Sequence, residues 1–397
     1  MRSKSPRARK CPVCHLPAAK SGRNRSGTQR WRCGPCELTF TSTRPDLTQA
    51  AQFAAFLAYI TGKQAKNDLA GPGWSRSTLN RKWAWCWGVP IPKPVVTGEI
   101  YDQLFIDGIY LPDSWVLLTA VNHRGELVAW QWGAYENKAA YKALLEGLAP
   151  PLMVTTDGAQ GALTAVKELW EGEGTVIQRC LLHIHRNNIT DLTSRPKTPA
   201  GQALLRLSQR IGKVRDLDDL SFWQQGLAAF HAVYGDWLKE RSFAKDDPEE
   251  GKRRGRTWWY THDRDRRVYQ RLNRLNREGT MWNHLTCAGP GLTFQPTTNQ
   301  AESLNASIRR LLDHHRGLSA NHMQTAVEWL LHSRSEAAQD PNTIYRQWDQ
   351  AGRPTRRVLP RKQAPQPKPL GPARWGNTPT PEEGLWVRKG WAGRWTP

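Results

Sequence analysis

Two Cys-x-x-Cys pairs near the start of the chain restrict how its first residues can fold. The pairs are Cys11/Cys14 and Cys33/Cys36, and a polar, glycine-containing segment separates them. A tetrahedral Zn²⁺ ion takes four thiolate ligands, and two such pairs about 20 residues apart supply them. The alternative, a pair of redox dithiols, requires a thioredoxin-like βαβ setting that the surrounding sequence lacks. We therefore predict a zinc ribbon over residues 1–45, held together by structural Zn²⁺.

The charge balance of the chain points to a polyanionic partner. The 397 residues include 57 Lys or Arg against 35 Asp or Glu, which gives a formal net charge of +22. Nucleic acid is the partner that such a charge favours, and the alternative is a basic surface that serves only solubility. The longest apolar stretch is too short to span a bilayer, and no secretory signal pattern follows the basic first residues. We expect a soluble intracellular protein that binds nucleic acid and no membrane.

Residues 46–90 change to a helical pattern. Apolar residues from Phe53 to Ile60 recur at helical spacing, a Gly-Pro-Gly break follows, and Ser75 or Ser77 can cap another helix. We expect a small helix-turn-helix-like DNA-binding unit, and a plain helical linker is the alternative. The polar residues that open its last helix are the candidates for DNA contact: Arg76, Asn80 and Arg81.

From residue 91 onward the pattern is that of an α/β domain. Apolar segments of strand length occupy residues 104–111, 115–122, 126–132, 152–156 and 175–178. Three antiparallel strands followed by alternating helices and strands is the order of an RNase H-like fold, although other mixed α/β domains also fit. We expect this core to comprise residues 91–190 and 295–335, with a helical insertion over residues 191–294.

Two aspartates stand where this sheet would meet a ligand. Asp107 lies in the middle of the first apolar strand, where a carboxylate is costly to bury without a cation. Asp157 ends the fourth strand, a position that faces a ligand crevice. In an RNase H-like sheet these two strands are neighbours, so the two carboxylates can share a divalent metal ion. Asp102 is a rival for Asp107, but its odd offset places it on the opposite face of the strand. Two ordinary strand-end aspartates are the alternative.

A third carboxylate, Glu302, lies in a segment with helical periodicity. One stripe of that helix is apolar and the other is polar, which suits the wall of an active site, although amphipathic surface helices are common. The apolar stripe consists of Ala301, Leu304, Ile308 and Leu311. The polar stripe consists of Asn299, Glu302, Asn305 and Arg309.

Four sequence blocks resemble those of the Mutator-like bacterial insertion-sequence transposases. LFIDGIYL, TTDGAQGAL, IQRCLLHIHRNNI and NQAESLNASIRR occur in the order of that family and fall within residues 100–335. The resemblance implies a DDE-class enzyme with an RNase H-like catalytic core. In such an enzyme Asp107, Asp157 and Glu302 would hold two Mg²⁺ ions, for which Mn²⁺ can substitute. The resemblance also implies bacterial cytoplasm, on the nucleoid, as the location.

The third block contains a Cys-x-x-His motif. The resemblance implies that Cys180 and His183 belong to the active site, with His183 near the scissile phosphate. Two isolated ligands do not make a closed zinc site, so we do not predict a metal ion on this pair.

The resemblance implies a transposase that binds the ends of its own insertion sequence, cuts them and joins them to target DNA. Paired ends imply a homodimer or larger assembly. A DNA-binding regulator derived from a transposase is the alternative, but the three acids weigh against it. An RNA-binding zinc-ribbon protein would explain the charge but not the acids.

Further basic residues are candidates for DNA contact. The stretch 252–277 interleaves Lys and Arg with Trp258 and Trp259, which suits single-stranded or distorted DNA, although burial of both tryptophans is as plausible. The segment 336–397 is rich in Pro, Arg and Trp, and we expect poor order from about residue 338. The additional candidates for DNA contact are Arg186, Arg264, Arg266, Arg267, Arg309 and Arg310.

Overall fold

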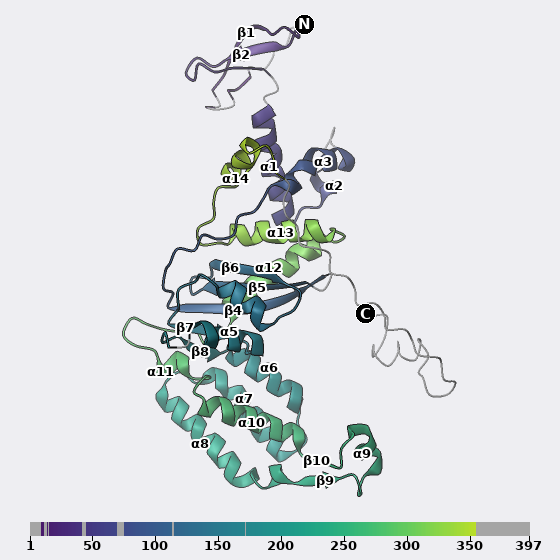
Figure 1. Ribbon diagram of the computed structural model, residues 1–397, viewed down its shortest axis with the longest axis vertical. Coiled ribbons are helices and arrows are strands. Elements are labelled where there is room, and N and C mark those ends of the chain that lie inside the picture. The colour runs from purple at the N-terminus through teal and green to yellow at the C-terminus, as the bar shows by residue number, and fades with distance from the viewer. Residues whose placement is uncertain are drawn as a thin grey trace, which may run out of the picture. The chain divides into compact units, whose positions relative to one another are not determined.

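The computed structural model of the chain describes residues 9–11, 14, 16–41, 45–69, 75–112, 115–170 and 172–354 (Figure 1). The first eight residues of the predicted ribbon, the Gly-Pro-Gly break and the tail from residue 355 therefore lie outside the described residues. Within the described part, no helix combines the length and the apolar character that crossing a membrane requires.

A small antiparallel sheet forms the first structured region. Its strands, in the order β1-β2-β3, are β1 (Ala19–Arg23), β2 (Gln29–Arg32) and β3 (Thr39–Thr41). The buried apolar side chains beneath it are Ala18, Trp31 and Phe40. A core of this size buries too little apolar surface to hold a fold by itself, so the region depends on a further cross-link.

Three helices and a 3₁₀ turn follow. They are α1 (Pro45–Thr61), α2 (Lys66–Leu69), α3 (Arg76–Trp83) and η1 (Ala84–Gly88). Ser75 caps α3 as predicted, because its hydroxyl accepts a hydrogen bond from the Thr78 backbone N–H at 3.2 Å. Phe53 of α1 packs edge-on against Trp329 with ring centroids 5.5 Å apart. The helical region therefore shares its apolar core with the segments described next.

A five-stranded mixed sheet occupies the middle of the chain. Its strands are β4 (Gln103–Leu111), β5 (Trp115–Asn122), β6 (Leu127–Gly133), β7 (Met153–Thr156) and β8 (Val176–Arg179). The order is β6-β5-β4-β7-β8, with β4 antiparallel to β5, β5 antiparallel to β6, and β7 parallel to both β4 and β8. Each predicted strand is present, and its ends lie within one residue of the prediction.

Helices cover both faces of this sheet (Figure 1). Leu104 and Ile106 of β4 point toward α4 (Lys138–Leu145) and α5 (Gln160–Trp170). Phe105 and Ile109 alternate with them and join a second cluster on the opposite face. Helices α1 and α3 contribute to this second cluster, together with α12 (Asn299–His314), α13 (Ala320–Ser333) and α14 (Pro341–Gln350).

Residues between β8 and α12 form a mainly helical region with its own apolar cluster. Its helices α6, α7, α8 and α10 lie side by side (Figure 1). Trp223 and Trp282 meet edge to face within this cluster, with ring centroids 5.1 Å apart. The helices are α6 (Leu181–Leu192), α7 (Pro199–Arg210), η3 (Ile211–Lys213), α8 (Leu217–Tyr234), η4 (Trp237–Lys239), α9 (Pro248–Arg254), α10 (Asp263–Arg277) and α11 (Asn283–Thr286).

Two features of the structure differ from the sequence interpretation. A short antiparallel ribbon of β9 (Arg241–Phe243) and β10 (Trp258–Tyr260) lies within the helical region. Strand alternation buries Trp259 and leaves Trp258 38% exposed. The expectation of poor order from residue 338 was wrong over α14, because Ile344 and Trp348 are buried in the core beside the sheet.

Candidate functional site

The four cysteines of the first region converge on one point. The sulfur atoms of Cys11, Cys14, Cys33 and Cys36 all lie within 4.8 Å of one another, and the Cys14 and Cys33 sulfurs are 3.4 Å apart. Cys11 and Cys14 precede β1, whereas Cys33 and Cys36 follow β2, so pairing of these strands brings the pairs together. All seven cysteines of the chain are reduced. This arrangement can hold a structural Zn²⁺ ion, and it supplies the cross-link that the small core requires.

The four thiols are close enough to affect one another's protonation. The neighbouring thiol of Cys14 raises the pKa of Cys36 to about 12, with burial as a further cause. Four thiolates so close together repel one another unless a cation neutralises them. Zinc binding would therefore release protons from the cluster, which is the coupling expected for a thiolate metal site.

A second site lies where β7 ends beside the middle of β4. Asp107 and Asp157 occupy equivalent places on these adjacent strands. Ile106 of β4 pairs in register with Thr156 of β7, and each aspartate is the next residue along its strand direction. Parallel strands lie about 4.8 Å apart, so both carboxylates leave the same face of the sheet as close neighbours. That face is the one covered by α12, and the rival Asp102 is exposed and precedes the strand.

The Asp107 carboxylate is buried and strongly perturbed. Its residue is only 8% exposed, and burial followed by the negative charge of Asp157 raises its pKa to about 6. The Asn305 side-chain amide of α12 donates a 2.8 Å hydrogen bond to Asp107 Oδ2. The Oδ1 atom of Asn305 is itself buried and meets no hydrogen-bond donor among the described residues. The buried Asp107 carboxylate thus has a donor in Asn305, whereas the buried Asn305 oxygen has none among the described residues.

The backbone after β7 fixes the direction of Asp157. Its Oδ1 accepts a 2.8 Å hydrogen bond from the backbone N–H of Ala159. Gly158 has φ of +94°, and a Cβ there would lie 1.8 Å from the guanidinium of Arg179. Only glycine suits this turn, since the backbone is left-handed and Arg179 covers it while donating to the Asp157 carbonyl at 3.0 Å. The turn therefore fixes the direction of the Asp157 carboxylate, and the Arg179 guanidinium lies beside the Asp157 backbone.

Glu302 lies on the first turn of α12, but its carboxylate points to a different set of partners. Glu302 Oε2 is 3.3 Å from the Arg186 guanidinium, and Oε1 is 3.8 Å from His183 Nδ1. Thr298, which precedes the helix, donates to the same Oε1 at 3.4 Å. The apolar stripe predicted for this helix is buried as expected. Asn305 of the polar stripe is buried too, because it contacts Asp107.

The three acids surround one region without forming a closed cluster. The charges of both Asp157 and Glu302 act to raise the Asp107 pKa, which places them within electrostatic reach. Among the described residues, however, the groups whose ligand atoms all lie within 4.8 Å of one another are the four cysteines and a second set, Cys180, His183 and Glu302. In this structure Glu302 thus belongs with the Cys-x-x-His motif rather than with the two aspartates.

The Cys-x-x-His motif opens helix α6. Cys180 is fully buried, and its sulfur accepts hydrogen bonds from the backbone N–H and the hydroxyl of Thr298 at 3.4 and 3.3 Å. Burial acts to raise the pKa of the Cys180 thiol, but hydrogen bonds from His183 and Thr298 outweigh it and lower the pKa overall. The hydrogen bond to Cys180 raises the pKa of His183 against the effect of burial. The two pKa shifts have opposite directions, as expected for a thiol and an imidazole that are hydrogen-bonded to each other.

The predicted DNA-contact residues differ in their availability. Arg76, Arg81, Arg264 and Arg309 are exposed. The Asn80 side-chain oxygen accepts from Lys66 Nζ at 2.7 Å, and Arg186 is paired with Glu302. Other side chains in the set also have partners within the protein. Arg266 donates to the Leu238 carbonyl, Arg267 pairs with Asp191 at 2.6 Å, and Arg310 donates to Ser307.

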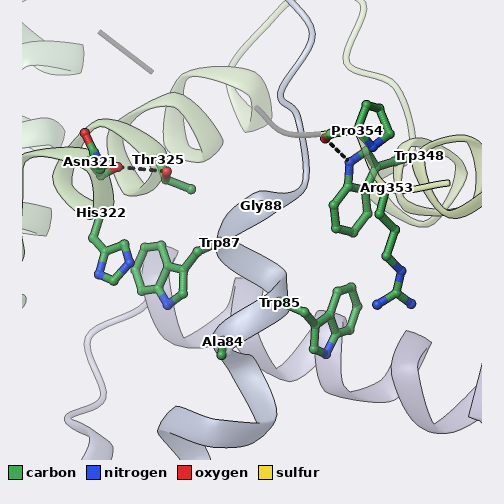
Figure 2. A pocket seen from close by; sticks show the side chains of 10 residues that line it. All are labelled: Ala84, Trp85, Trp87, Gly88, Asn321, His322, Thr325, Trp348, Arg353 and Pro354. Carbon is green, nitrogen blue, oxygen red and sulfur yellow. Dashed lines mark hydrogen bonds between the residues drawn. The ribbon is translucent and has the colours of Figure 1, made fainter. Parts of the chain in front are cut away.

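A hollow of about 490 Å³ lies away from the acids, where η1 meets α13 and α14 (Figure 2). In Figure 2 the Trp87 ring lies against that of His322, and their centroids are 3.9 Å apart. The Arg353 guanidinium lies over both Trp85 and Trp348, at 5.3 and 5.5 Å from their centroids. The lining is mainly aromatic and carries no carboxylate, so this hollow offers no anionic oxygen ligand to a hard cation.

Sequence reasoning missed three residues that shape the acidic site. Asn305 was assigned only to a polar stripe, Thr298 was not considered, and Arg179 was noted only as part of a motif. The burial of a polar residue at a helix position that faces a sheet is the signal that would have identified Asn305.

No family model matches this chain, and no curated protein is significantly similar to it.

Proposed function

We propose that the chain is a metal-dependent DNA transposase. The observation that carries this proposal is the approach of Asp107, Asp157 and Glu302 to one region, although Glu302 lies 145 positions after Asp157 in the chain. Three acids within electrostatic reach of one another have no use in a protein that only binds DNA. The strand order is β6-β5-β4-β7-β8, in which β4, β5 and β6 are antiparallel while β7 is parallel to β4 and β8. This order supports an RNase H-like core.

The residues around Asp107 suit a hard divalent cation. Mg²⁺ prefers oxygen ligands, and a carboxylate with a pKa raised to about 6 gains the most when a cation replaces its proton. The acceptor atom of Asn305, buried and without a donor among the described residues, adds a neutral oxygen beside it. Asp107, Asp157 and Glu302 would hold two Mg²⁺ ions, which would supply Lewis-acid stabilisation of the attacking and leaving oxygens.

The side chains of the protein would prepare this site for the reaction. Asn305 fixes the rotamer of Asp107, and the turn through Gly158 fixes that of Asp157. Glu302 would have to leave Arg186 and His183 to join them. Its departure would free the His183 imidazolium and the Arg186 guanidinium to contact the scissile phosphate.

The positively charged surface would supply DNA binding. The four-cysteine region and helix α3 carry exposed Arg residues, and α10 adds Arg264. Each phosphate that such a residue neutralises on duplex DNA contributes about 0.9 to the slope of log affinity against log salt. Since Arg266 and Arg267 bond within the protein, we expect that replacing Arg264 alone lowers the slope nearly as much as replacing all three. Paired transposon ends would require at least two copies of the chain.

One experiment tests the proposal directly. The purified full-length protein is incubated with DNA that carries the ends of its own element, with Mg²⁺ or Mn²⁺, and strand breaks are mapped at nucleotide resolution. We expect metal-dependent nicks at the element ends and joined products, and their loss in Asp157→Asn. Binding of the ends without any metal-dependent break would contradict the proposal and favour a transposase-derived DNA-binding regulator.

A further inference from the structure

Four donor atoms at the start of α6 and α12 surround a space of ionic size. The ligand atoms of Cys180, His183 and Glu302 all lie within 4.8 Å of one another. The Thr298 hydroxyl oxygen is 3.3 Å from Cys180 Sγ, 3.5 Å from His183 Nδ1 and 3.4 Å from Glu302 Oε1. Sulfur, imidazole nitrogen, carboxylate oxygen and hydroxyl oxygen thus form the four corners of a tetrahedron.

The size of this tetrahedron matches that of a zinc site. Zn–O, Zn–N and Zn–S bonds of about 2.0, 2.1 and 2.3 Å at tetrahedral angles give ligand–ligand separations of roughly 3.3–3.6 Å. The three separations from Thr298 Oγ1 fall in that range, and the His183–Glu302 separation of 3.8 Å is only slightly longer. The remaining separations, from Cys180 to His183 and to Glu302, are within 4.8 Å, so the side chains would draw together around an ion.

The chemistry of the donors selects a soft ion over a hard one. Thiolate and imidazole ligands favour Zn²⁺ or Co²⁺, whereas Mg²⁺ requires oxygen ligands in octahedral geometry. Cys180 is fully buried, while the side chains of His183 and Glu302 are 24% and 28% exposed. The sulfur is thus shielded from solvent, and an ion would reach the site from the side of His183 and Glu302.

We propose that Cys180, His183 and Glu302 form a second, soft-metal site for Zn²⁺, with the Thr298 hydroxyl at the fourth corner. Zinc binding requires the thiolate form of Cys180, so a thiol proton would be released to solvent. This site includes none of the four clustered cysteines. Its carboxylate, Glu302, is also one of the three acids of the proposed Mg²⁺ site. The regulatory consequence rests on the proposed function: Zn²⁺ on this site would hold Glu302 away from Asp107 and Asp157 and so inhibit strand cleavage.

The metal site can be tested without any activity assay. The full-length protein, with Zn²⁺ already bound to the four cysteines, is titrated with Co²⁺ and followed by absorption spectroscopy. We expect one additional equivalent of Co²⁺ with the visible bands of tetrahedral coordination and a thiolate-to-metal charge-transfer band. In Cys180→Ser the charge-transfer band should vanish and the affinity should fall on the order of 100-fold or more.

Two further variants make the outcome decisive. Glu302 is partly exposed, so Glu302→Gln should fold even if Cys180→Ser does not, and it should also weaken the tetrahedral spectrum. Cys287→Ser, which removes a partly buried thiol outside the cluster, is the matched control and should bind Co²⁺ as the parent does. The proposed site would be wrong if the parent, with Zn²⁺ on the four cysteines, bound no Co²⁺ in tetrahedral coordination. It would also be wrong if the Glu302→Gln variant gave the same Co²⁺ spectrum as the parent.

A separate arm tests the regulatory consequence. If the parent cleaves DNA with Mg²⁺, stoichiometric Zn²⁺ should inhibit cleavage, and excess Mg²⁺ should relieve the inhibition by competing for Glu302. Failure to cleave under any condition would contradict the proposed function, and the Co²⁺ titration would then decide by itself whether the soft-metal site exists. Cleavage that Zn²⁺ does not inhibit would overturn the competition for Glu302 even where Co²⁺ binds.

Discussion

The four-cysteine cluster and the acidic site show two different ways in which a chain brings side chains of one kind together. The cysteines span only 25 positions, from Cys11 to Cys36, and pairing of two adjacent strands brings their sulfurs within 4.8 Å of one another. The acids come from β4, from the end of β7 and from α12, and their oxygens do not form such a cluster among the described residues.

This difference has an electrostatic cause. The neighbouring Cys14 thiol raises the pKa of Cys36 to about 12, and a protonated thiol does not repel its neighbours. Ionised carboxylates repel one another. Glu302 avoids this repulsion by contacting Arg186 and His183, while Asp107 is held by Asn305. On the proposed function a cation would bring the three acids together, whereas the four sulfur atoms already lie close enough to hold one.

The largest expected effect separates the metal-holding role of Glu302 from a structural one. Glu302→Gln keeps the size of the side chain but removes its charge, and we expect strand cleavage to fall by roughly 10³-fold or more because a ligand of the catalytic ions is lost. Binding to DNA ends, measured by mobility shift, should be almost unchanged. Cleavage by Glu302→Gln at the rate of the parent would mean that Glu302 is not the third acid of the site.

The choice of control for that variant follows from the structure. Asp313 is on the same helix, and its side chain is 70% exposed, so Asp313→Asn should leave both binding and cleavage unchanged. Glu328 on α13 is unsuitable, because it is buried and accepts hydrogen bonds from Trp132 and Gln324 at 2.9 and 2.8 Å. Its replacement would disturb the core whatever its role in chemistry.

The next effect tests whether the cysteine cluster depends on its ion. Cys33→Ser removes one of four ligands from a region with three buried apolar side chains, so we expect that region to lose its zinc and unfold. Affinity for DNA ends should weaken, while the denaturant unfolding of the sheet should change by less than about 0.5 kcal/mol. Zinc content, limited proteolysis and urea titration measure the three outcomes. A native protein that contains no zinc would contradict the assignment.

Much of this arrangement could be predicted from the sequence, because its signals are local. Cys-x-x-Cys spacing, apolar runs of strand length and the stripe of α12 each depend on neighbours a few residues apart. These patterns located all five strands of the large sheet and the burial of Ala301 and Ile308. They also identified the four cysteines whose sulfurs meet.

The remaining features depend on contacts between distant residues, which no local pattern encodes. Asn305 meets Asp107 across 198 positions, and Thr298 meets Cys180 across 118. The strands β9 and β10 have three residues each, too few for periodicity to be detected. Helix α14 was mistaken for tail because Pro and Arg dominate its surroundings, although Ile344 and Trp348 provide a helical apolar face.

A smaller effect should appear as a change of stability with pH. The Asp107 pKa is raised from its ordinary value of 3.8 to about 6, so the folded protein binds that proton more tightly than the unfolded chain. The stabilisation is complete below about pH 4 and is lost as the pH rises through 6. Without Mg²⁺, Asp107→Asn should therefore unfold at higher urea than the parent above pH 6, by up to about 3 kcal/mol, and should lose this advantage near pH 4.

The addition of Mg²⁺ sharpens this stability test. A cation bound to Asp107 would stabilise the parent but not the Asn variant, so Mg²⁺ should narrow the difference between them at pH 7. Zinc remains bound to the cysteines throughout, which keeps their contribution constant. A parent that is more stable than Asp107→Asn at pH 7 without Mg²⁺ would show that the buried carboxylate is already neutralised by the protein, and that the acidic site needs no cation.

The smallest effect concerns the ion pair that holds Glu302 away from the aspartates. Side chains of Arg186 and Glu302 are 52% and 28% exposed, and a partly exposed pair of this kind contributes at most about 1 kcal/mol. Arg186→Ala should free Glu302 and raise the affinity for Mn²⁺ by up to about fivefold, as measured by electron paramagnetic resonance of unbound Mn²⁺ without DNA. Arg310→Ala removes an exposed arginine of α12 that donates to Ser307, and it should leave the affinity unchanged. If Arg186→Ala and Arg310→Ala bound Mn²⁺ with equal affinity, the ion pair with Arg186 would not be what separates Glu302 from the aspartates. Repulsion among the carboxylates alone would then explain that separation.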